Sequence, residues 1–146
     1  MNLGIVASKF NSEVTSISLK AAKEKAKELH LNVIEVIEVF GAFDSPLAVK
    51  KLFSRAEIDG VIVIGAIIKG QTEHDKVIAV TTFKSLQELS LEFNKPLGLA
   101  ISGPGMTSAQ AKKRANLIAE NAVIAVKMLS EISDSKEDEE IKPRIL

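Results

Sequence analysis

The feature that most limits how this chain can fold is a nearly continuous apolar run from Ile58 to Ala66. A short run of this kind, rich in valine and isoleucine, is typical of a parallel strand buried on both faces. The run leads into a turn bounded by Gly65 and Gly70, and a helical pattern follows from Thr72 to Phe93. Strand, glycine-rich turn and helix in this order indicate an α/β protein.

The rest of the chain repeats the alternation of strand and helix. We expect the four strands to form one parallel sheet with helices on both faces, because each strand is followed by a helix. The predicted fold is therefore α/β, a three-layer α-β-α sandwich with a four-stranded parallel sheet. The other expected strands are 2–8, 32–39 and 96–102, and the other expected helices are about 12–29, 45–55 and 108–132.

Local residues mark where several of these elements begin and end. Ser45 is the expected N-cap of the second helix, with Pro46 at the first helical position. Thr107 is the expected N-cap of the last helix. The sequence Gly103-Pro104-Gly105 predicts a sharp turn that ends the fourth strand.

Composition narrows the classes of function. The 146 residues carry no net formal charge at pH 7, so the composition does not indicate the extended positive surface with which proteins bind nucleic acid. The absence of cysteine removes disulfides, thiolate metal sites and cysteine nucleophiles. No apolar run reaches the length of a membrane span. We therefore expect a cytoplasmic protein with one domain over residues 1–132, followed by a charged, solvated tail over residues 133–146.

The residues best suited to binding or catalysis lie at the carboxyl ends of the predicted strands, where ligands bind in open α/β sheets. The turn before His74 would offer backbone N–H groups and a helix N-terminus to an anion. The chain has neither a P-loop nor a dinucleotide fingerprint, so a simple phosphate monoester fits better than a nucleotide. Histidine adds proton transfer near neutral pH. The aromatic residues are all phenylalanine, and Phe10, Phe40 and Phe43 fall beside predicted strand ends.

Each candidate residue also has a purely structural explanation. His74 could be a solvent-facing residue at a helix start, and Thr72 an ordinary N-cap of the same helix. Arg114 could belong to a solvated basic helix face, although its guanidinium also suits a phosphate clamp. Sequence spacing does not bring Arg114 to the Gly70 turn. His30, the second histidine, is expected at a helix end on the opposite rim, which disfavours a metal site.

Taken together, four segments resemble the lumazine synthases, the family that forms 6,7-dimethyl-8-ribityllumazine in riboflavin biosynthesis. The similarity covers about residues 3–129, and the Gly-x-x-x-x-Gly-x-Thr-x-His pattern behind a strand is its most specific part. The stretch Ile101–Thr107 resembles the archaeal branch of the family. The four segments are Ala7–Asn11, Gly41–Pro46, Gly65–His74 and Lys113–Arg114.

The resemblance implies a flavodoxin-like fold and a reaction that needs no cofactor or metal. In that reaction 5-amino-6-(D-ribitylamino)uracil condenses with 3,4-dihydroxy-2-butanone 4-phosphate, and phosphate and water are released. By similarity, His74 would be the catalytic proton-transfer residue. The implied phosphate-binding residues are Gly70, Gln71, Thr72 and Arg114. The other implied substrate-binding residues are Phe10, Asn11, Ala42, Phe43, Asp44, Ile67, Ile68 and Leu99.

The family also implies a homo-oligomer. Its members form pentamers, and in some of them twelve pentamers build a sixty-subunit icosahedral shell. The active sites lie between adjacent subunits, so Leu99 and Arg114 would come from a neighbouring chain. The expected partners are small-molecule substrates and copies of the chain, with no nucleic acid and no membrane. Two alternatives stay open, an archaeal-type riboflavin synthase and a non-catalytic flavin- or lumazine-binding shell protein.

The chain departs from the common family pattern at several places, two of which are implied substrate-binding residues. Asp44 stands where the familiar bacterial sequence has glutamate, so its carboxylate reaches one methylene less far. Leu99 stands where many relatives carry a phenylalanine over the substrate ring. Both differences fall on the implied substrate pocket.

Overall fold

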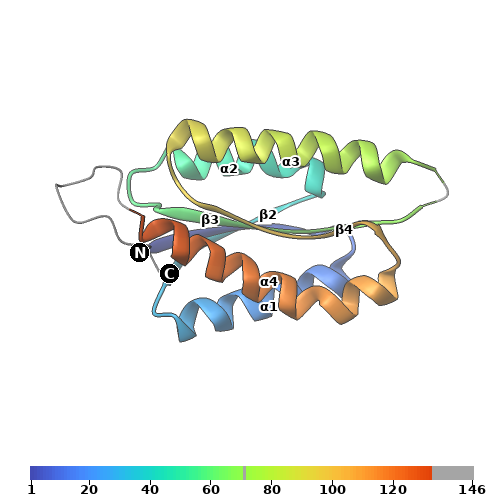
Figure 1. Cartoon of the computed structure of the whole chain (residues 1–146), viewed down its shortest axis with the longest axis horizontal. Helices are drawn as coiled ribbons and strands as arrows, with labels where there is room; N and C mark the ends of the chain where they lie inside the picture. The colour runs from blue at the N-terminus through green and yellow to red at the C-terminus, as the bar shows by residue number, and fades with distance from the viewer. Residues whose placement is uncertain (71, 133–146) are drawn as a thin grey trace, which may run out of the picture.

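The computed structural model describes residues 1–70 and 72–132, and within them strands and helices alternate along the chain (Figure 1). The predicted tail over residues 133–146 lies outside the described residues. The elements are β1 (Asn2–Ser8), α1 (Ser12–Glu28), β2 (Asn32–Val39), the 3₁₀ turn η1 (Ala42–Asp44), α2 (Ser45–Phe53), β3 (Gly60–Ile68), α3 (His74–Phe93), β4 (Leu97–Met106) and α4 (Ser108–Ser130).

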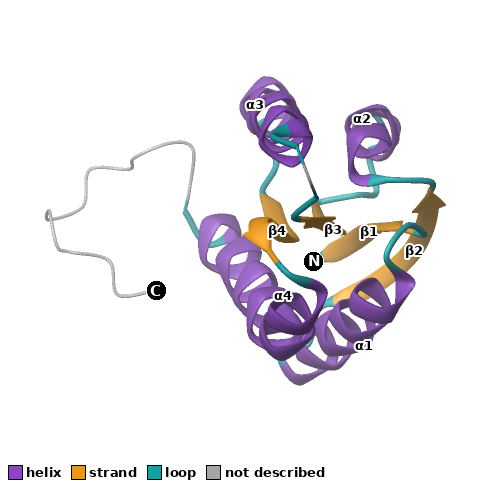
Figure 2. Ribbon diagram, turned by 90° about the vertical axis from the view of Figure 1, so that its right-hand side faces the viewer, coloured by secondary structure: helices purple, strands orange, loops and turns teal. Residues whose placement is uncertain are grey.

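The four strands form one parallel sheet in the order β2-β1-β3-β4. Helices α2 and α3 cover one face of the sheet, and α1 and α4 cover the other, as the end-on view shows (Figure 2). The predicted three-layer α-β-α sandwich is therefore confirmed. β1 and β2 have the expected bounds, whereas β3 lies two residues further along the chain than expected.

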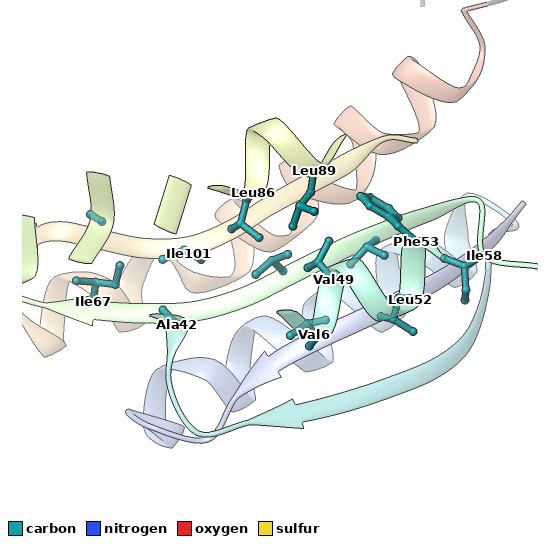
Figure 3. Close-up of a cluster of buried hydrophobic side chains, with 14 residues drawn as sticks. Val6, Ala42, Val49, Leu52, Phe53, Ile58, Ile67, Leu86, Leu89 and Ile101 are labelled. Atoms are coloured by element: carbon teal, nitrogen blue, oxygen red, sulfur yellow. The ribbon is translucent and has the colours of Figure 1, made fainter. Parts of the chain in front are cut away.

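A hydrophobic core lies on each side of the sheet. On the side of α2 and α3, side chains of the sheet and of these helices interlock around Val6, Val49 and Leu86 (Figure 3). On the other side, alanines of α1 and α4 pack against Leu3, Ile5 and other apolar residues of the sheet. β3 contributes to both cores because its residues from Gly60 to Ile67 are buried on both faces. The apolar run in the sequence thus forms most of an inner strand of the central sheet.

Two helices begin at different residues from those expected. Ser45 is the first residue of α2 and not its N-cap, because its buried hydroxyl donates a hydrogen bond to the carbonyl of Ala42 at 2.6 Å. Asp44 occupies the N-cap position instead. α3 begins at His74 and not at Thr72. The Thr72 hydroxyl still supports the helix start, since it accepts a hydrogen bond from the His74 N–H at 3.3 Å.

The predicted turn at Gly103-Pro104-Gly105 does not end the fourth strand. β4 continues to Met106, which pairs with Ile68 after a register shift in β3. Gly103 has a φ of 100°, and a Cβ on it would lie 2.1 Å from the carbonyl oxygen of Ile67. Only glycine therefore permits this close approach of the two strands. The last helix begins where expected, because Thr107 is its N-cap and shares reciprocal hydrogen bonds with Gln110.

No helix in the described part of the chain is long and apolar enough to cross a membrane. The same residues contain no cluster of three or more histidine, aspartate or glutamate side chains arranged to hold a metal ion.

Candidate active site

The carboxyl ends of β1, β2 and β3 meet the start of α3 around a pocket of about 420 Å³. Most residues that the sequence singled out line this pocket. Those brought together are Phe10, Asn11, Ala42, Phe43, Asp44, Ile67, Ile68, Gly70, Thr72 and His74. Gln71 lies outside the described residues. The pocket also includes residues that no site prediction contained, among them Phe40 and Asp75.

Asn11 connects two of the strand ends. It is the N-cap of α1 and has a left-handed backbone with a φ of 61°, which asparagine tolerates better than most residues. Its side chain does not cap the helix. The Nδ2 group instead donates a hydrogen bond to the carbonyl of Ala66 at 2.9 Å. This bond fixes the end of β1 against the end of β3, and thereby holds the neighbouring Phe10 at the pocket wall.

The segment from Gly41 to Ser45 forms a second, tightly bonded wall. The Oδ2 atom of Asp44 accepts a hydrogen bond from the Gly41 N–H at 3.0 Å, and Ser45 bonds to Ala42 from inside the fold. These bonds hold η1 in one conformation. Phe43 remains 62% exposed, and Asp44 is exposed as well. The wall therefore presents an apolar ring and a carboxylate side by side.

The third wall is the loop between β3 and α3. The Lys69 N–H donates to the carbonyl of Met106 at 2.8 Å, which holds the start of the loop to β4. A Cβ on Gly70 would meet no atom within 4 Å, so open space surrounds this residue. Thr72 and His74 are both exposed. The described part of this loop thus borders open space next to the N-terminus of α3, the kind of position where anions bind in proteins.

Asp75 is the residue beside His74 whose role the sequence did not reveal. It is only 7% exposed, and its Oδ2 atom accepts a hydrogen bond from the Gly105 N–H at 3.2 Å. This bond ties the first turn of α3 to the end of β4. The position of an acidic residue in a first helical turn is a common signal, but the bond to a distant strand is visible only in three dimensions.

A charged pair lies on the outer side of the same helix start. The Lys76 ammonium is 2.8 Å from the Glu73 carboxylate, and its hydrogen bond to Glu73 raises the pKa of Lys76 above the usual value. Both side chains are exposed. Lys76 is not among the residues that line the pocket. The Lys76 charge is therefore engaged by Glu73 beside the N-terminus of α3, where the helix dipole also favours an anion.

Leu99 and Arg114 do not join the pocket within one chain. Leu99 is 40% exposed on β4, one of the two edge strands of the sheet, at the edge opposite β2. Arg114 is exposed on α4, which covers the opposite face of the sheet from α2 and α3 (Figure 2). Among the described residues that line the pocket, none is lysine or arginine. The described lining of the pocket in one chain therefore includes a histidine but neither of the two side chains that are always cationic at neutral pH.

Comparison with known proteins gives a consistent result. The chain matches the family model described as 6,7-dimethyl-8-ribityllumazine synthase over residues 1–133. It is 43% identical to the 6,7-dimethyl-8-ribityllumazine synthase of Methanococcus vannielii, with 93% of this chain and 97% of the relative covered. It is 42% identical to the protein of that name from Methanopyrus kandleri, with 92% and 95% covered. The identity to the protein of that name from Saccharolobus islandicus is also 42%, over 100% of this chain and 96% of the relative.

Proposed function

Because the chain belongs to the 6,7-dimethyl-8-ribityllumazine synthase family and is a transferase of riboflavin biosynthesis, we propose that the pocket at the carboxyl edge of the sheet is its active site. The reaction condenses 5-amino-6-(D-ribitylamino)uracil with 3,4-dihydroxy-2-butanone 4-phosphate. It proceeds by imine formation with loss of water, loss of inorganic phosphate, and ring closure with loss of a second water. A riboflavin synthase or a non-catalytic shell protein is not favoured by the relatives found.

The walls formed by Phe10 and Phe43 are the proposed site of the pyrimidine substrate. The Phe10 ring, which is 60% exposed at the pocket, would stack on the pyrimidine ring. Asn11 shapes this wall through its bond to Ala66. The backbone of Ile67 and Ile68 would contact the ring edge. Ala42, Phe43 and the second carboxylate oxygen of Asp44 would hold the ribityl chain, since hydroxyl groups donate well to a carboxylate.

The loop before α3 is the proposed site of the phosphorylated substrate. Gly70, Gln71 and Thr72 would contact the phosphate, which lies favourably at a helix N-terminus. Phosphate departure also needs a cation where negative charge develops. By similarity to the family, we assign that role to Arg114 of a neighbouring chain, and the lining of the pocket in one chain, which includes no lysine or arginine among its described residues, is consistent with this assignment. Leu99 of the neighbour would cover the substrate ring.

His74 is the proposed proton-transfer residue. Imine formation and the loss of water both need a group that accepts and returns protons. His74 is the histidine of the pocket, and Thr72 and Asp75 fix the helix turn on which it stands. Its exposed side chain can reach substrates held on either wall. Much of the remaining rate enhancement would come from holding the two substrates together.

A site shared between chains requires assembly. We propose a pentamer of domains formed by residues 1–132, with the sixty-subunit icosahedral shell as a larger possible form, and we propose that it acts in the cytoplasm. Sedimentation velocity and negative-stain microscopy distinguish a pentamer from a shell directly.

The observation that carries the proposed function is the meeting of exposed phenylalanines, the loop before α3 and a histidine in one pocket. Incubation of the protein with both precursors tests it. We expect lumazine and inorganic phosphate in equal amounts. Riboflavin formed from lumazine alone would indicate the riboflavin synthase alternative, and tight lumazine binding without phosphate release would indicate a non-catalytic shell protein.

A further inference from the structure

The aromatic residues of this chain fall into two groups, one packed in or against the core and the other exposed to solvent. Of the six phenylalanines, Phe53, Phe83 and Phe93 pack in or against the core on the α2 and α3 side. The other three are Phe10, Phe40 and Phe43, which are 60%, 74% and 62% exposed. All three exposed rings line the same pocket. Water-exposed phenyl rings that gather in one concave site indicate an apolar ligand surface.

Phe40 is held next to Phe10 by the backbone. The Phe10 N–H donates a hydrogen bond to the carbonyl of Phe40 at 2.9 Å, and the preceding Lys9 N–H donates to Val39 at 2.8 Å. Backbone hydrogen bonding between these segments therefore continues two residues beyond the end of β1 and one residue beyond the end of β2. The ring centroids lie 6.1 Å apart, with an angle of 31° between the ring planes. The two rings are thus neighbours on one wall and are positioned by hydrogen bonds rather than by a free loop.

We propose that Phe40 is a further substrate-binding residue, and that Phe40 and Phe10 together form a two-ring wall for the planar heterocycle. The proposal rests on the proposed function and extends its pyrimidine site by one residue. Phe40 has the largest exposed fraction among the large hydrophobic side chains described, so a bound ring would remove more apolar surface there than at Phe10. The tilt of 31° means that the two rings do not form one flat surface, so one phenyl would stack on a planar ligand while the other contacts it at an angle.

The test compares Phe40→Leu and Phe40→Tyr with wild type in the assembled protein. Isothermal titration with the lumazine product gives its dissociation constant, and steady-state kinetics give KM for each substrate. Loss of an aromatic contact should weaken lumazine binding and raise KM for the pyrimidine by about two- to tenfold. KM for the butanone phosphate should stay unchanged. Tyrosine keeps the ring, so Phe40→Tyr should bind like wild type.

Two controls separate this inference from other effects. Leu91→Ala removes an apolar side chain that is 72% exposed at the far end of α3, and it should leave lumazine binding unchanged. Phe10→Leu tests the pyrimidine site itself. Sedimentation velocity and thermal unfolding of each variant report whether assembly and fold are intact.

The possible results are distinct. Unchanged lumazine binding in Phe40→Leu, together with weaker binding in Phe10→Leu, overturns the role of Phe40 and leaves the proposed function standing. Dissociation of the assembly by Phe40→Leu also overturns it, since the ring would then serve a contact between chains. A wild-type protein that forms no lumazine from the two precursors contradicts the proposed function instead.

Discussion

The carboxylate of Asp75 accepts a hydrogen bond from the backbone N–H of Gly105, with 3.2 Å between Oδ2 and N. The bond joins the first turn of α3 to the end of β4, directly beside His74. A buried carboxylate with a backbone partner sets the position of a helix start more firmly than a surface cap. The orientation of His74 therefore depends on a strand that is 30 residues away in sequence.

Removing this bond should affect both stability and turnover. Asp75→Ala leaves the Gly105 N–H without its partner, which should lower the free energy of unfolding by about 1–3 kcal/mol. Displacement of His74 should lower kcat by about 10- to 100-fold. Asp59→Ala is the matched control, because Asp59 also accepts a backbone N–H, from Asn2 at 2.7 Å, but on the exposed opposite edge. Equal kcat losses in the two variants would argue against a positioning role for Asp75.

His74→Ala should remove the proton-transfer group and leave the fold intact, since the side chain is exposed. We expect kcat to fall by about 100- to 10,000-fold, with little change in lumazine affinity. His30→Asn serves as the control. His30 has a φ of 59°, which asparagine accepts, and follows the end of α1 at the opposite rim. A His74→Ala enzyme with wild-type kcat would exclude the proposed catalytic role.

Gly103 and Gly105 provide a matched pair for the close approach of β4 to β3. Gly103→Ala would bring a Cβ within 2.1 Å of the Ile67 carbonyl oxygen, in addition to the strain of a φ of 100°. The free energy of unfolding should fall by more than about 3 kcal/mol. Gly105→Ala meets no atom within 4 Å and carries only the strain of a φ of 78°, about 1–2 kcal/mol. Urea titration of both variants measures the difference, and similar losses would rule out a steric requirement at Gly103.

Arg114→Ala should raise KM for the butanone phosphate by about 10- to 100-fold through loss of a charge-assisted hydrogen bond. Stability should not change, because Arg114 is exposed. Lys112→Ala removes a nearby exposed cation of the same helix and should keep the wild-type KM. An unchanged KM in Arg114→Ala would remove this residue from the phosphate site.

Mixed assemblies test whether the site is shared between chains. Subunits with His74→Ala and subunits with Arg114→Ala are unfolded together and reassembled. If Arg114 of one chain completes the pocket of the next, some pockets in the mixed assembly combine the wild-type His74 of one chain with the wild-type Arg114 of the other. These pockets should regain activity. No recovery in fully reassembled mixtures would indicate that both residues act within one chain.

The sequence predicted the layers of the fold because its strands are short, apolar and separated by helical patterns. It also predicted that Phe10, Asp44 and His74 would meet, since parallel strands end at one edge of a sheet. It did not predict the path of β4 through Gly103 and Gly105. Glycine and proline in that order favour a turn, and only pairing with Ile68 keeps the segment in the sheet.

The roles of some single residues could not be predicted from the sequence either. Ser45 resembles an N-cap in sequence, but its burial turns the hydroxyl toward Ala42. The role of Asp75 depends on Gly105, and the aromatic neighbour of Phe10 depends on how far β1 and β2 remain paired. Local patterns record which residue types are present, whereas these roles arise from partners that are distant along the chain.

The separation of Arg114 from the pocket links catalysis to the number of chains present. Under the proposed assignment, a lone chain could hold the pyrimidine on its aromatic wall but could not neutralise the departing phosphate. Newly made or dissociated chains would then bind the phosphorylated substrate weakly, and specific activity at limiting substrate would fall on dilution below the assembly threshold. The protein would thereby couple its own concentration to the consumption of a reactive sugar phosphate, without a separate regulatory site.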